Sequence, residues 1–122
     1  REHNDNFSID SRIVFIGSLM AIRQHATSLA YGVTKAALHA LALNLVKCFE
    51  GTGTTVNAIA PGFVETEWQK DKPQEIRENI YKKTAIKRFA SIDEIADAVR
   101  FCIRNSFVNG SVIEISGGYS FK

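Results

Sequence analysis

Cysteine, histidine and net charge are all scarce in this sequence of 122 residues. Its two cysteines, Cys48 and Cys102, are too far apart for a C-x-x-C motif, and its three histidines include no pair with metal-ligand spacing. We therefore expect reduced thiols in a cytoplasmic protein, and no metal site. The formal net charge is +2, with both signs mixed along the chain. This balance lacks the basic stripe of nucleic-acid-binding proteins, so nucleic acid is not an expected partner.

Long apolar runs and targeting segments are missing as well. No uninterrupted apolar stretch approaches the ~20 residues that span a bilayer, and the polar residues 1–6 are not followed by the apolar region of a signal peptide. We expect no membrane association. A hydrophobic content of 45% with 23% charged residues is typical of a globular domain that buries a core.

The pattern of apolar runs and turn residues predicts alternating strands and helices. Strands are expected at residues 12–17, 54–60 and 111–115, and helices at residues 29–50, 73–83 and from 91 onward. Pro61-Gly62 should stop the second strand, residues 62–72 should form a loop around Trp68, and Ser91 with Glu94 should cap the last helix. This order predicts an α/β fold, one βαβαβ half of a three-layer, doubly wound, Rossmann-like parallel sheet.

The first predicted helix is unusual because the segment from Leu38 to Val46 is apolar on nearly every face and carries no charge. A helix that covers one face of a sheet needs a single apolar stripe. The remaining apolar face needs another cover, most simply the same helix of a partner subunit. We therefore expect a homodimer or homotetramer.

Tyr31 and Lys35 lie four residues apart in this helix, so their side chains should share one face. An ammonium group one turn from a phenol favours the phenolate, which makes a tyrosine a usable proton donor and acceptor near neutral pH. Ser18 follows the first strand, and α/β sheets place their chemistry beyond the carboxyl ends of parallel strands. Its hydroxyl can then bond the same substrate oxygen that Tyr31 protonates.

This arrangement resembles the active site of the short-chain dehydrogenase/reductase family, and the resemblance covers residues 12–120. The matching motifs are Ser18, Tyr31-x-x-x-Lys35, Asn57-x-x-x-Pro61-Gly62, Thr66 and Ile115-Ser-Gly-Gly118. Ser116 stands where the family usually has aspartate. Residues 61–66 and the closing G-S-V-I-E-I-S-G-G-Y are most similar to the 3-oxoacyl-acyl carrier protein reductases, which points to fatty acid biosynthesis.

The resemblance implies an oxidoreductase that uses NADP or NAD to reduce a small-molecule carbonyl substrate, such as a 3-oxoacyl thioester, to a secondary alcohol. Tyr31 would donate a proton to the carbonyl oxygen, Lys35 would bond the cofactor ribose, and Ser18 would position that oxygen. The implied cofactor-binding residues are Tyr31, Lys35, Pro61, Gly62, Phe63, Val64 and Thr66. The implied substrate-binding residues are Ser18, Met20 and Trp68.

A glycine cradle for a pyrophosphate is absent, because no G-x-x-x-G-x-G loop occurs in the sequence. We therefore expect residues 1–122 to be the carboxyl-terminal, catalytic half of a single Rossmann-like domain, with the nucleotide-binding amino-terminal half outside this sequence. The chain alone should be inactive. The open edge of its first strand should also make it prone to association.

Two other functions remain open. An epimerase or dehydratase of the family's extended branch also uses Tyr-x-x-x-Lys, but about 90 residues follow Tyr31, too few for that branch's added substrate domain. The third hypothesis is a non-catalytic fragment that acts by oligomer assembly through the apolar helix.

Several candidate residues also have a structural interpretation. Ser18 could be a turn hydroxyl at a strand end, and Thr66 could cap a short helical turn. We expect Asn57 to bond backbone groups of a neighbouring loop. We expect His25 and His39 to be a loop residue and an interface residue without a catalytic role.

Overall fold

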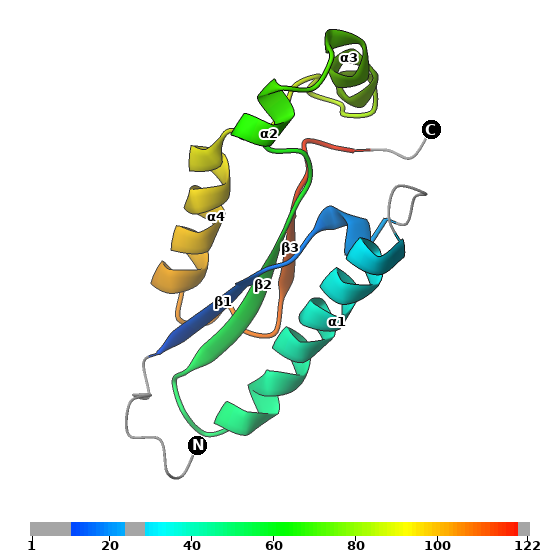
Figure 1. Cartoon of the computed structure of the whole chain (residues 1–122). Helices are drawn as coiled ribbons and strands as arrows, with labels where there is room; N and C mark the ends of the chain where they lie inside the picture. The colour runs from blue at the N-terminus through cyan, green and yellow to red at the C-terminus, as the bar shows by residue number, and fades with distance from the viewer. Residues whose placement is uncertain (1–10, 24–28, 120–122) are drawn as a thin grey trace.

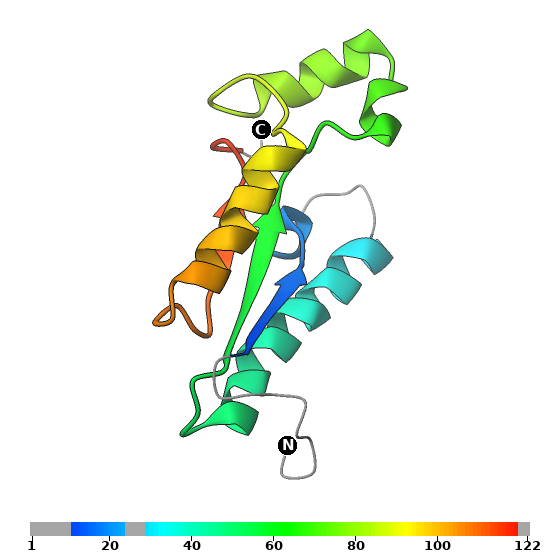
Figure 2. The ribbon, with the colours of Figure 1, turned by 90° about the vertical axis from the view of Figure 1, so that its left-hand side faces the viewer.

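The computed structural model describes residues 11–23 and 29–119. Strands β1 (Arg12–Ile16), β2 (Thr55–Pro61) and β3 (Val112–Ile115) form one parallel sheet in the order β1-β2-β3 (Figure 1). Helix α1 (Leu29–Leu45) covers one face of this sheet and α4 (Ile92–Arg104) covers the other (Figure 2). The predicted three-layer α/β fold with parallel strands is therefore confirmed.

β2 lies at the centre of the sheet, and its sequence suits that place. Alternate residues of a strand point to opposite faces of a sheet. Val56 and Ala58 face α1 and form a fully buried cluster with Ala42, whereas Ile59 faces α4 and packs with Cys102. Because both faces of β2 are covered, the strand is largely apolar, as buried parallel strands are.

Asn57 interrupts the apolar run of β2 and is completely buried. Its side-chain nitrogen donates to the Val108 carbonyl at 2.9 Å, and its side-chain oxygen accepts from the Ser111 N–H at 3.0 Å. Both bonds hold the turn that connects α4 to β3. The expected structural role of Asn57 is confirmed.

Pro61 is the last residue of β2 and pairs with Ile115, so the prediction that the strand stops before this proline was wrong. The N–H groups of Ala58 in β2 and of Gly62 just after it, both at even positions, point toward β3 and the residue before it. The nitrogen of Pro61 therefore faces the opposite side, where the pairing of β1 has already ended at Ile16. No ladder hydrogen bond is lost, so the strand accommodates proline.

The predicted helix at 29–50 is divided into two parts. The α-helix ends at Leu45 and continues as a 3-10 turn, Val46–Phe49, before Gly51 adopts a left-handed conformation with φ of +78°. Glycine takes this conformation after a helix at little cost because it has no Cβ. The helical segment thus ends near the predicted residue, with a tighter last turn.

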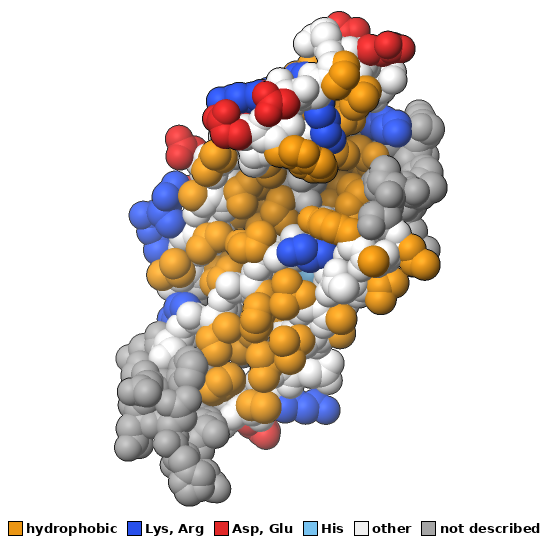
Figure 3. All heavy atoms as spheres, in the orientation of Figure 1, with side chains coloured by type: hydrophobic (Ala, Val, Ile, Leu, Met, Phe, Trp, Pro, Cys, Tyr) orange, Lys and Arg blue, Asp and Glu red, His pale blue; other side chains and the backbone are white. Residues whose placement is uncertain are grey.

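The outer face of α1 is apolar and exposed. The exposed fractions of Leu29, Val33, Leu41 and Leu43 are 85%, 59%, 47% and 44%. Together with the 3-10 turn, this helix is long and apolar enough to cross a membrane by length and composition, a test that core helices of soluble proteins also pass. Hydrophobic side chains also gather between α1 and α4, over the open edge at β1 (Figure 3). The described residues therefore expose apolar side chains both on the outer face of α1 and at the β1 edge.

Residues 63–90 form a lobe beyond the carboxyl end of the sheet, and it contains α2 (Glu67–Lys70) and α3 (Gln74–Lys82) (Figure 1). The prediction of a loop at 62–72 was incomplete, because α2 lies within it. The guanidinium of Arg77 holds the lobe together. It donates hydrogen bonds to the Glu65 carboxylate (2.8 Å), the Gln69 carbonyl (2.7 Å) and the Tyr81 hydroxyl (2.9 Å), and it lies 4.7 Å from the centroid of the Phe89 ring.

The predicted capping box at the start of α4 is confirmed. The Ser91 hydroxyl accepts from the Glu94 N–H at 3.1 Å, and the Glu94 carboxylate accepts from the Ser91 N–H at 2.8 Å. The Arg88 guanidinium donates two further bonds to this carboxylate, at 2.7 and 2.8 Å. The bonds from Arg88, and then the one from Ser91, lower the pKa of Glu94 to about 2.

Replacing Glu94 with glutamine should destabilise the protein in a pH-dependent way. A carboxyl group whose pKa falls from 4.5 to about 2 on folding stabilises the fold above pH 4.5 and loses that effect as the pH falls toward 2. The urea midpoint of Glu94→Gln should be lower than that of the wild type at pH 7, and this gap should narrow below pH 4.5. Glu78→Gln, which removes an exposed carboxylate bonded to Gln74 at 3.4 Å, is the control. A gap that stays constant down to pH 3 would contradict the role of Glu94.

Candidate active site

The carboxyl ends of the three strands meet at one edge of the sheet. Gly17 follows β1 and donates its N–H to β2 at 2.7 Å, and Gly62 follows β2 and donates its N–H to β3 at 2.9 Å. A Cβ on Gly62 would lie 3.2 Å from the Cα of Ser116 and 3.5 Å from the Leu19 side chain. Three segments far apart in the sequence are therefore neighbours, as the parallel topology predicts.

Ser18 lies at this edge and is buried, with 5% of its surface exposed. It precedes a 3-10 turn, Leu19–Ala21, and its hydroxyl oxygen accepts from the Met20 N–H at 3.1 Å. The interpretation of Ser18 as a turn hydroxyl is thus confirmed, because its oxygen caps the 3-10 turn. A hydroxyl that accepts one hydrogen bond still carries its own proton, so the Ser18 hydroxyl also keeps a donor for another oxygen.

Tyr31 and Lys35 share one face of α1, as their spacing predicts. The Lys35 ammonium lies 5.8 Å from the centroid of the Tyr31 ring and donates to the backbone carbonyl of Ile16 at 3.1 Å. Ile16 is the last residue of β1, two residues before Ser18. The bond therefore fastens the first turns of α1 to the strand end that carries Ser18.

His39 lies one further turn along the same face of α1, and the sequence-based expectation of an interface residue was wrong. Its ring is 7% exposed, and its Nε2 accepts the Ser18 backbone N–H at 3.1 Å. Gly17 makes room for this ring, because a Cβ there would overlap it. Burial, and then the positive charge of Lys35, lower the pKa of His39 from its ordinary value of 6.5. The spacing of four residues from Lys35 was the signal that could have identified it.

The segment after Gly62 is held mainly through its backbone. The Phe63 carbonyl accepts from the Ala90 N–H at 2.9 Å, and Val64 forms a parallel bridge with Ala90. The Phe63 ring packs on the rings of Phe89 and Tyr119, with centroids 6.0 and 5.9 Å away. These contacts connect the strand edge to the 63–90 lobe.

The remaining candidate residues lie around this lobe and the 3-10 turn. Thr66 occupies the N-cap position of α2, but its side chain makes no capping hydrogen bond. Trp68 is 72% exposed, and the Lys72 ammonium lies 4.6 Å from its ring centroid. Met20 is half-buried in the 3-10 turn that follows Ser18. His25 lies outside the described residues.

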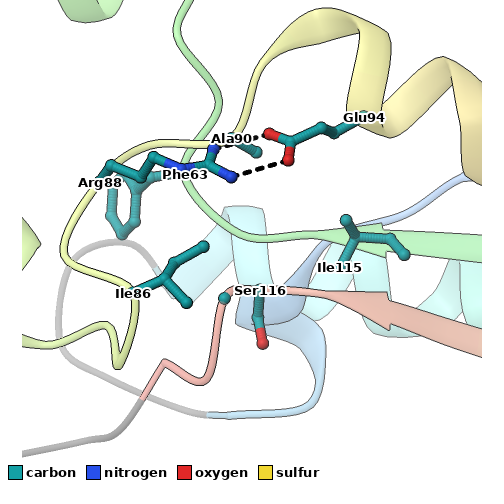
Figure 4. A pocket seen from close by; sticks show the side chains of 8 residues that line it. Phe63, Ile86, Arg88, Ala90, Glu94, Ile115 and Ser116 are labelled. Atoms are coloured by element: carbon teal, nitrogen blue, oxygen red, sulfur yellow. Dashed lines mark hydrogen bonds and ion pairs between the residues drawn. The ribbon is translucent and has the colours of Figure 1, made fainter.

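A cavity of about 120 Å³ adjoins the strand edge (Figure 4). Its walls are Phe63, Ile86, Arg88, Ala90, Glu94, Ile115, Ser116 and Gly117. Arg88 donates two hydrogen bonds to the Glu94 carboxylate at this wall. The other lining residues are mostly apolar. The cavity lies beside the carboxyl end of β3 and is lined by none of Ser18, Tyr31 and Lys35.

The described parts of the chain contain no cluster of side chains that could bind a metal ion. Within residues 11–23 and 29–119, no three His, Cys, Asp or Glu side chains are placed together to hold an ion. The groups at the sheet edge are instead a hydroxyl, a phenol, an ammonium and a neutral imidazole. Such a set can donate hydrogen bonds to an oxygen and transfer protons to it.

A parallel sheet covered on both faces, with these groups at its carboxyl edge, is a Rossmann-like α/β architecture. Residues 3–120 match the family model described as enoyl-(acyl carrier protein) reductase. The chain belongs to the short-chain dehydrogenase/reductase family. The resemblance inferred from the sequence motifs is therefore confirmed.

Curated relatives agree with this assignment. The chain is 33% identical over 109 residues to the 3-oxoacyl-[acyl-carrier-protein] reductase FabG of Aquifex aeolicus, an alignment that covers 88% of this chain and 44% of that protein. It is 34% identical over 110 residues to the acetoacetyl-CoA reductase of Synechocystis, covering 88% of this chain and 46% of that protein. The chain therefore spans about half the length of the curated relatives it matches.

Solved structures show the same architecture. The chain superimposes on a 3-hydroxyacyl-CoA dehydrogenase type-2 from Mycobacterium avium with a TM-score of 0.87 and 26% identity, covering 98% of this chain and 46% of that one. It superimposes on a short-chain dehydrogenase/reductase from Brucella melitensis with a TM-score of 0.85 and 30% identity, covering 95% and 48%. A third match, ElxO with NADP bound, has a TM-score of 0.82 and 27% identity, covering 88% and 46%.

Replacing Gly17 with alanine should destabilise the protein, because the new methyl group would overlap the buried His39 ring. Overpacking of this kind costs about 1–3 kcal/mol, and the loss should appear as a lower urea midpoint. Gly32→Ala is the matched control. Gly32 lies within α1, and among the described residues its Cβ would meet nothing closer than the Met20 carbonyl at 3.5 Å, so alanine there should be neutral or stabilising. Equal midpoints for Gly17→Ala and the wild type would contradict the packing described.

Proposed function

We propose that this protein is an NAD(P)-dependent reductase that converts a small carbonyl compound, of the 3-oxoacyl thioester class, to a secondary alcohol. The observation that carries the proposal is the bond from the Lys35 ammonium to the Ile16 carbonyl, 3.1 Å long. This bond places the Tyr31 and Lys35 turn of α1 beside the strand end that carries Ser18. The 3-oxoacyl and acetoacetyl-CoA reductases among its relatives support the substrate class.

Tyr31 and Ser18 act on the substrate oxygen in this proposal. Tyr31 is 43% exposed, and its phenol is the proton donor in this proposal. It donates a proton to the carbonyl oxygen as that oxygen gains negative charge. The Ser18 hydroxyl, which already accepts from the Met20 N–H, donates its own proton as a hydrogen bond to the same oxygen.

The residues at the strand edge fit the nicotinamide and ribose end of a dinucleotide. An ammonium has three N–H donors, so Lys35 can bond Ile16 and ribose hydroxyls together. The nicotinamide would lie along the backbone of Pro61, Gly62, Phe63 and Val64, where Gly62 has no side chain to obstruct it. The Thr66 hydroxyl makes no capping hydrogen bond to α2, so a carboxamide that binds it would displace no such bond. NADP or NAD, when bound, would supply the hydride that reduces the substrate carbon.

Met20 and Trp68 would contact the substrate in this proposal. Met20 belongs to the 3-10 turn after Ser18 and is half-buried, so its flexible side chain can form an apolar wall. Trp68 is exposed on the 63–90 lobe, which is joined to the strand edge through Phe63 and Val64. Movement of this lobe would carry Trp68 over a bound substrate.

The organisation of the whole protein is part of the proposal. No G-x-x-x-G-x-G loop occurs in this sequence, so we assign the chain to the carboxyl-terminal, catalytic half of a Rossmann-like domain and expect the isolated chain to be inactive. We also propose a cytoplasmic homo-oligomer that is assembled through the apolar outer face of α1. The exposed fractions of Leu29, Val33, Leu41 and Leu43 support this assembly.

Replacing Tyr31 with phenylalanine should abolish the reduction, because it removes the proton donor and leaves the ring. In the intact protein, oxidation of NADPH or NADH by a β-keto ester, followed by absorbance, should fall at least about 100-fold. Ser106→Ala removes an exposed hydroxyl from the turn between α4 and β3, at the opposite end of the sheet, and should keep the wild-type rate. Turnover by Tyr31→Phe at the wild-type rate would contradict the proposed role of Tyr31 as proton donor.

A charge on the outer face of α1 should break the proposed oligomer. Leu41→Glu places a carboxylate on that face, whereas Phe107→Glu makes the same change at a 96% exposed side chain outside α1. Light scattering of the intact protein should show a smaller species for Leu41→Glu and the wild-type mass for Phe107→Glu. An unchanged mass for Leu41→Glu would place the interface elsewhere.

A further inference from the structure

The bond between His39 and Ser18 is a contact that the proposed chemistry does not use. The Nε2 of His39 accepts the Ser18 N–H at 3.1 Å, and this bond is buried. Ser18 is also held through its side chain, whose oxygen accepts the Met20 N–H at 3.1 Å. Two hydrogen bonds, one to the backbone and one to the side chain, therefore fix the position of this residue.

The acceptor role requires a neutral imidazole. A ring that accepts at Nε2 carries its proton on Nδ1, and an imidazolium has no acceptor at all. Burial and the nearby Lys35 charge both lower the pKa of His39. Of the elements packed against α1, β2 and the Leu19–Ala21 turn carry no charged residue, the Val46–Phe49 turn carries Lys47, and β1 carries Arg12. The Arg12 guanidinium donates to Ile103 and Gly53, at the opposite end of β1.

The glycine before Ser18 belongs to the same arrangement. A Cβ on Gly17 would overlap the His39 ring, so the ring approaches the strand end only because residue 17 lacks a side chain. The ring therefore packs directly against the Gly17 backbone and bonds the next N–H. This close approach makes His39 a support for the Ser18 backbone.

We propose that His39 is the positioning residue for Ser18, and that protonation of its ring releases the Ser18 backbone and reversibly weakens the site in acid. His39 acts through Ser18 and touches no substrate. Loss of the acceptor leaves the buried Ser18 N–H unpaired, which favours a shift of the Gly17-Ser18 backbone. A small displacement of a positioned hydroxyl is enough to slow a reaction markedly. The catalytic consequence rests on the function proposed above, whereas the contact itself does not.

The contact can be tested by NMR of the intact protein without any turnover. Labelling glycine with ¹³C at the carbonyl and serine with ¹⁵N selects Gly-Ser pairs, of which this sequence has two, Gly17-Ser18 and Gly110-Ser111. The Ser111 N–H donates to the side chain of Asn57 at 3.0 Å and serves as the internal control. On acidification below pH 6.5, the ordinary pKa of histidine, the Ser18 signal should shift and its amide exchange should accelerate, while the Ser111 signal stays unchanged.

Two variants separate the acceptor from the bulk of the ring. His39→Leu is apolar and of similar size but has no acceptor, so the Ser18 amide should lose its protection at every pH. His39→Gln can place an amide oxygen near the position of Nε2, so protection should return, without the acid transition of the wild type. A Ser18 amide that stays protected in His39→Leu, or that does not respond to pH in the wild type, would overturn the proposal.

Activity gives a second readout on the same variants. The kcat for carbonyl reduction should fall about tenfold in His39→Leu with little change in KM, and His39→Gln should recover most of it and lose the acid limb of the wild-type pH profile. A kcat in His39→Leu equal to that of the wild type would overturn the positioning role. A protein without any turnover would overturn the proposed function instead, and the Ser18 signal would still decide the His39 contact.

Discussion

Parallel pairing of β2 with both of its neighbours is the constraint on which the rest of the structure depends. It brings the carboxyl ends of three strands to one edge, so that the segments at Gly17, Gly62 and Ser116 lie together although about fifty residues separate each from the next. Burial of β2 on both faces fixes the positions of α1 and α4. The site residues occupy the edge that this pairing creates.

α1 converts this edge into a site through a repeat of four residues. Tyr31, Lys35 and His39 follow one another at one-turn intervals, and the last two reach the end of β1 in different ways. Lys35 bonds the carbonyl of Ile16, and His39 accepts the N–H of Ser18. The orientation of the helix and the backbone of the strand end are therefore set by the same side chains. A change in the packing of α1 would move all of these groups together.

The 63–90 lobe is organised differently, around charge and aromatic rings. Arg77 joins α3 to the chain before α2 through Glu65, and its guanidinium also lies against the ring of Phe89. Phe63 links this group to the strand edge, since its ring packs on Phe89 and its carbonyl bonds Ala90. The lobe is also bonded to the segment after β3, because the N–H groups of Ala85 and Ile86 donate to the Gly117 carbonyl at 3.0 and 3.3 Å.

Much of this arrangement is determined by the sequence itself. The apolar runs specify the strands, the spacing of Tyr31 and Lys35 specifies their shared face, and Ser91 with Glu94 specifies the start of α4. These are local features, because each depends on residues within one or two turns, where propensity and periodicity are informative. The motifs also identify the family, since their order along the chain is preserved.

Tertiary structure alone decided the role of His39, the tolerance of Pro61 and the partners of Arg77. The spacing of His39 from Lys35 indicates a shared face of α1, but only the tertiary structure shows that the ring packs on Gly17 and accepts the Ser18 N–H. Pro61 is accommodated because the pairing of β1 with β2 ends at Ile16 and Ile59, so no residue of β1 is left to accept a hydrogen bond from position 61. In each case the deciding contact joins residues distant in the chain, and no local pattern encodes the distance between them.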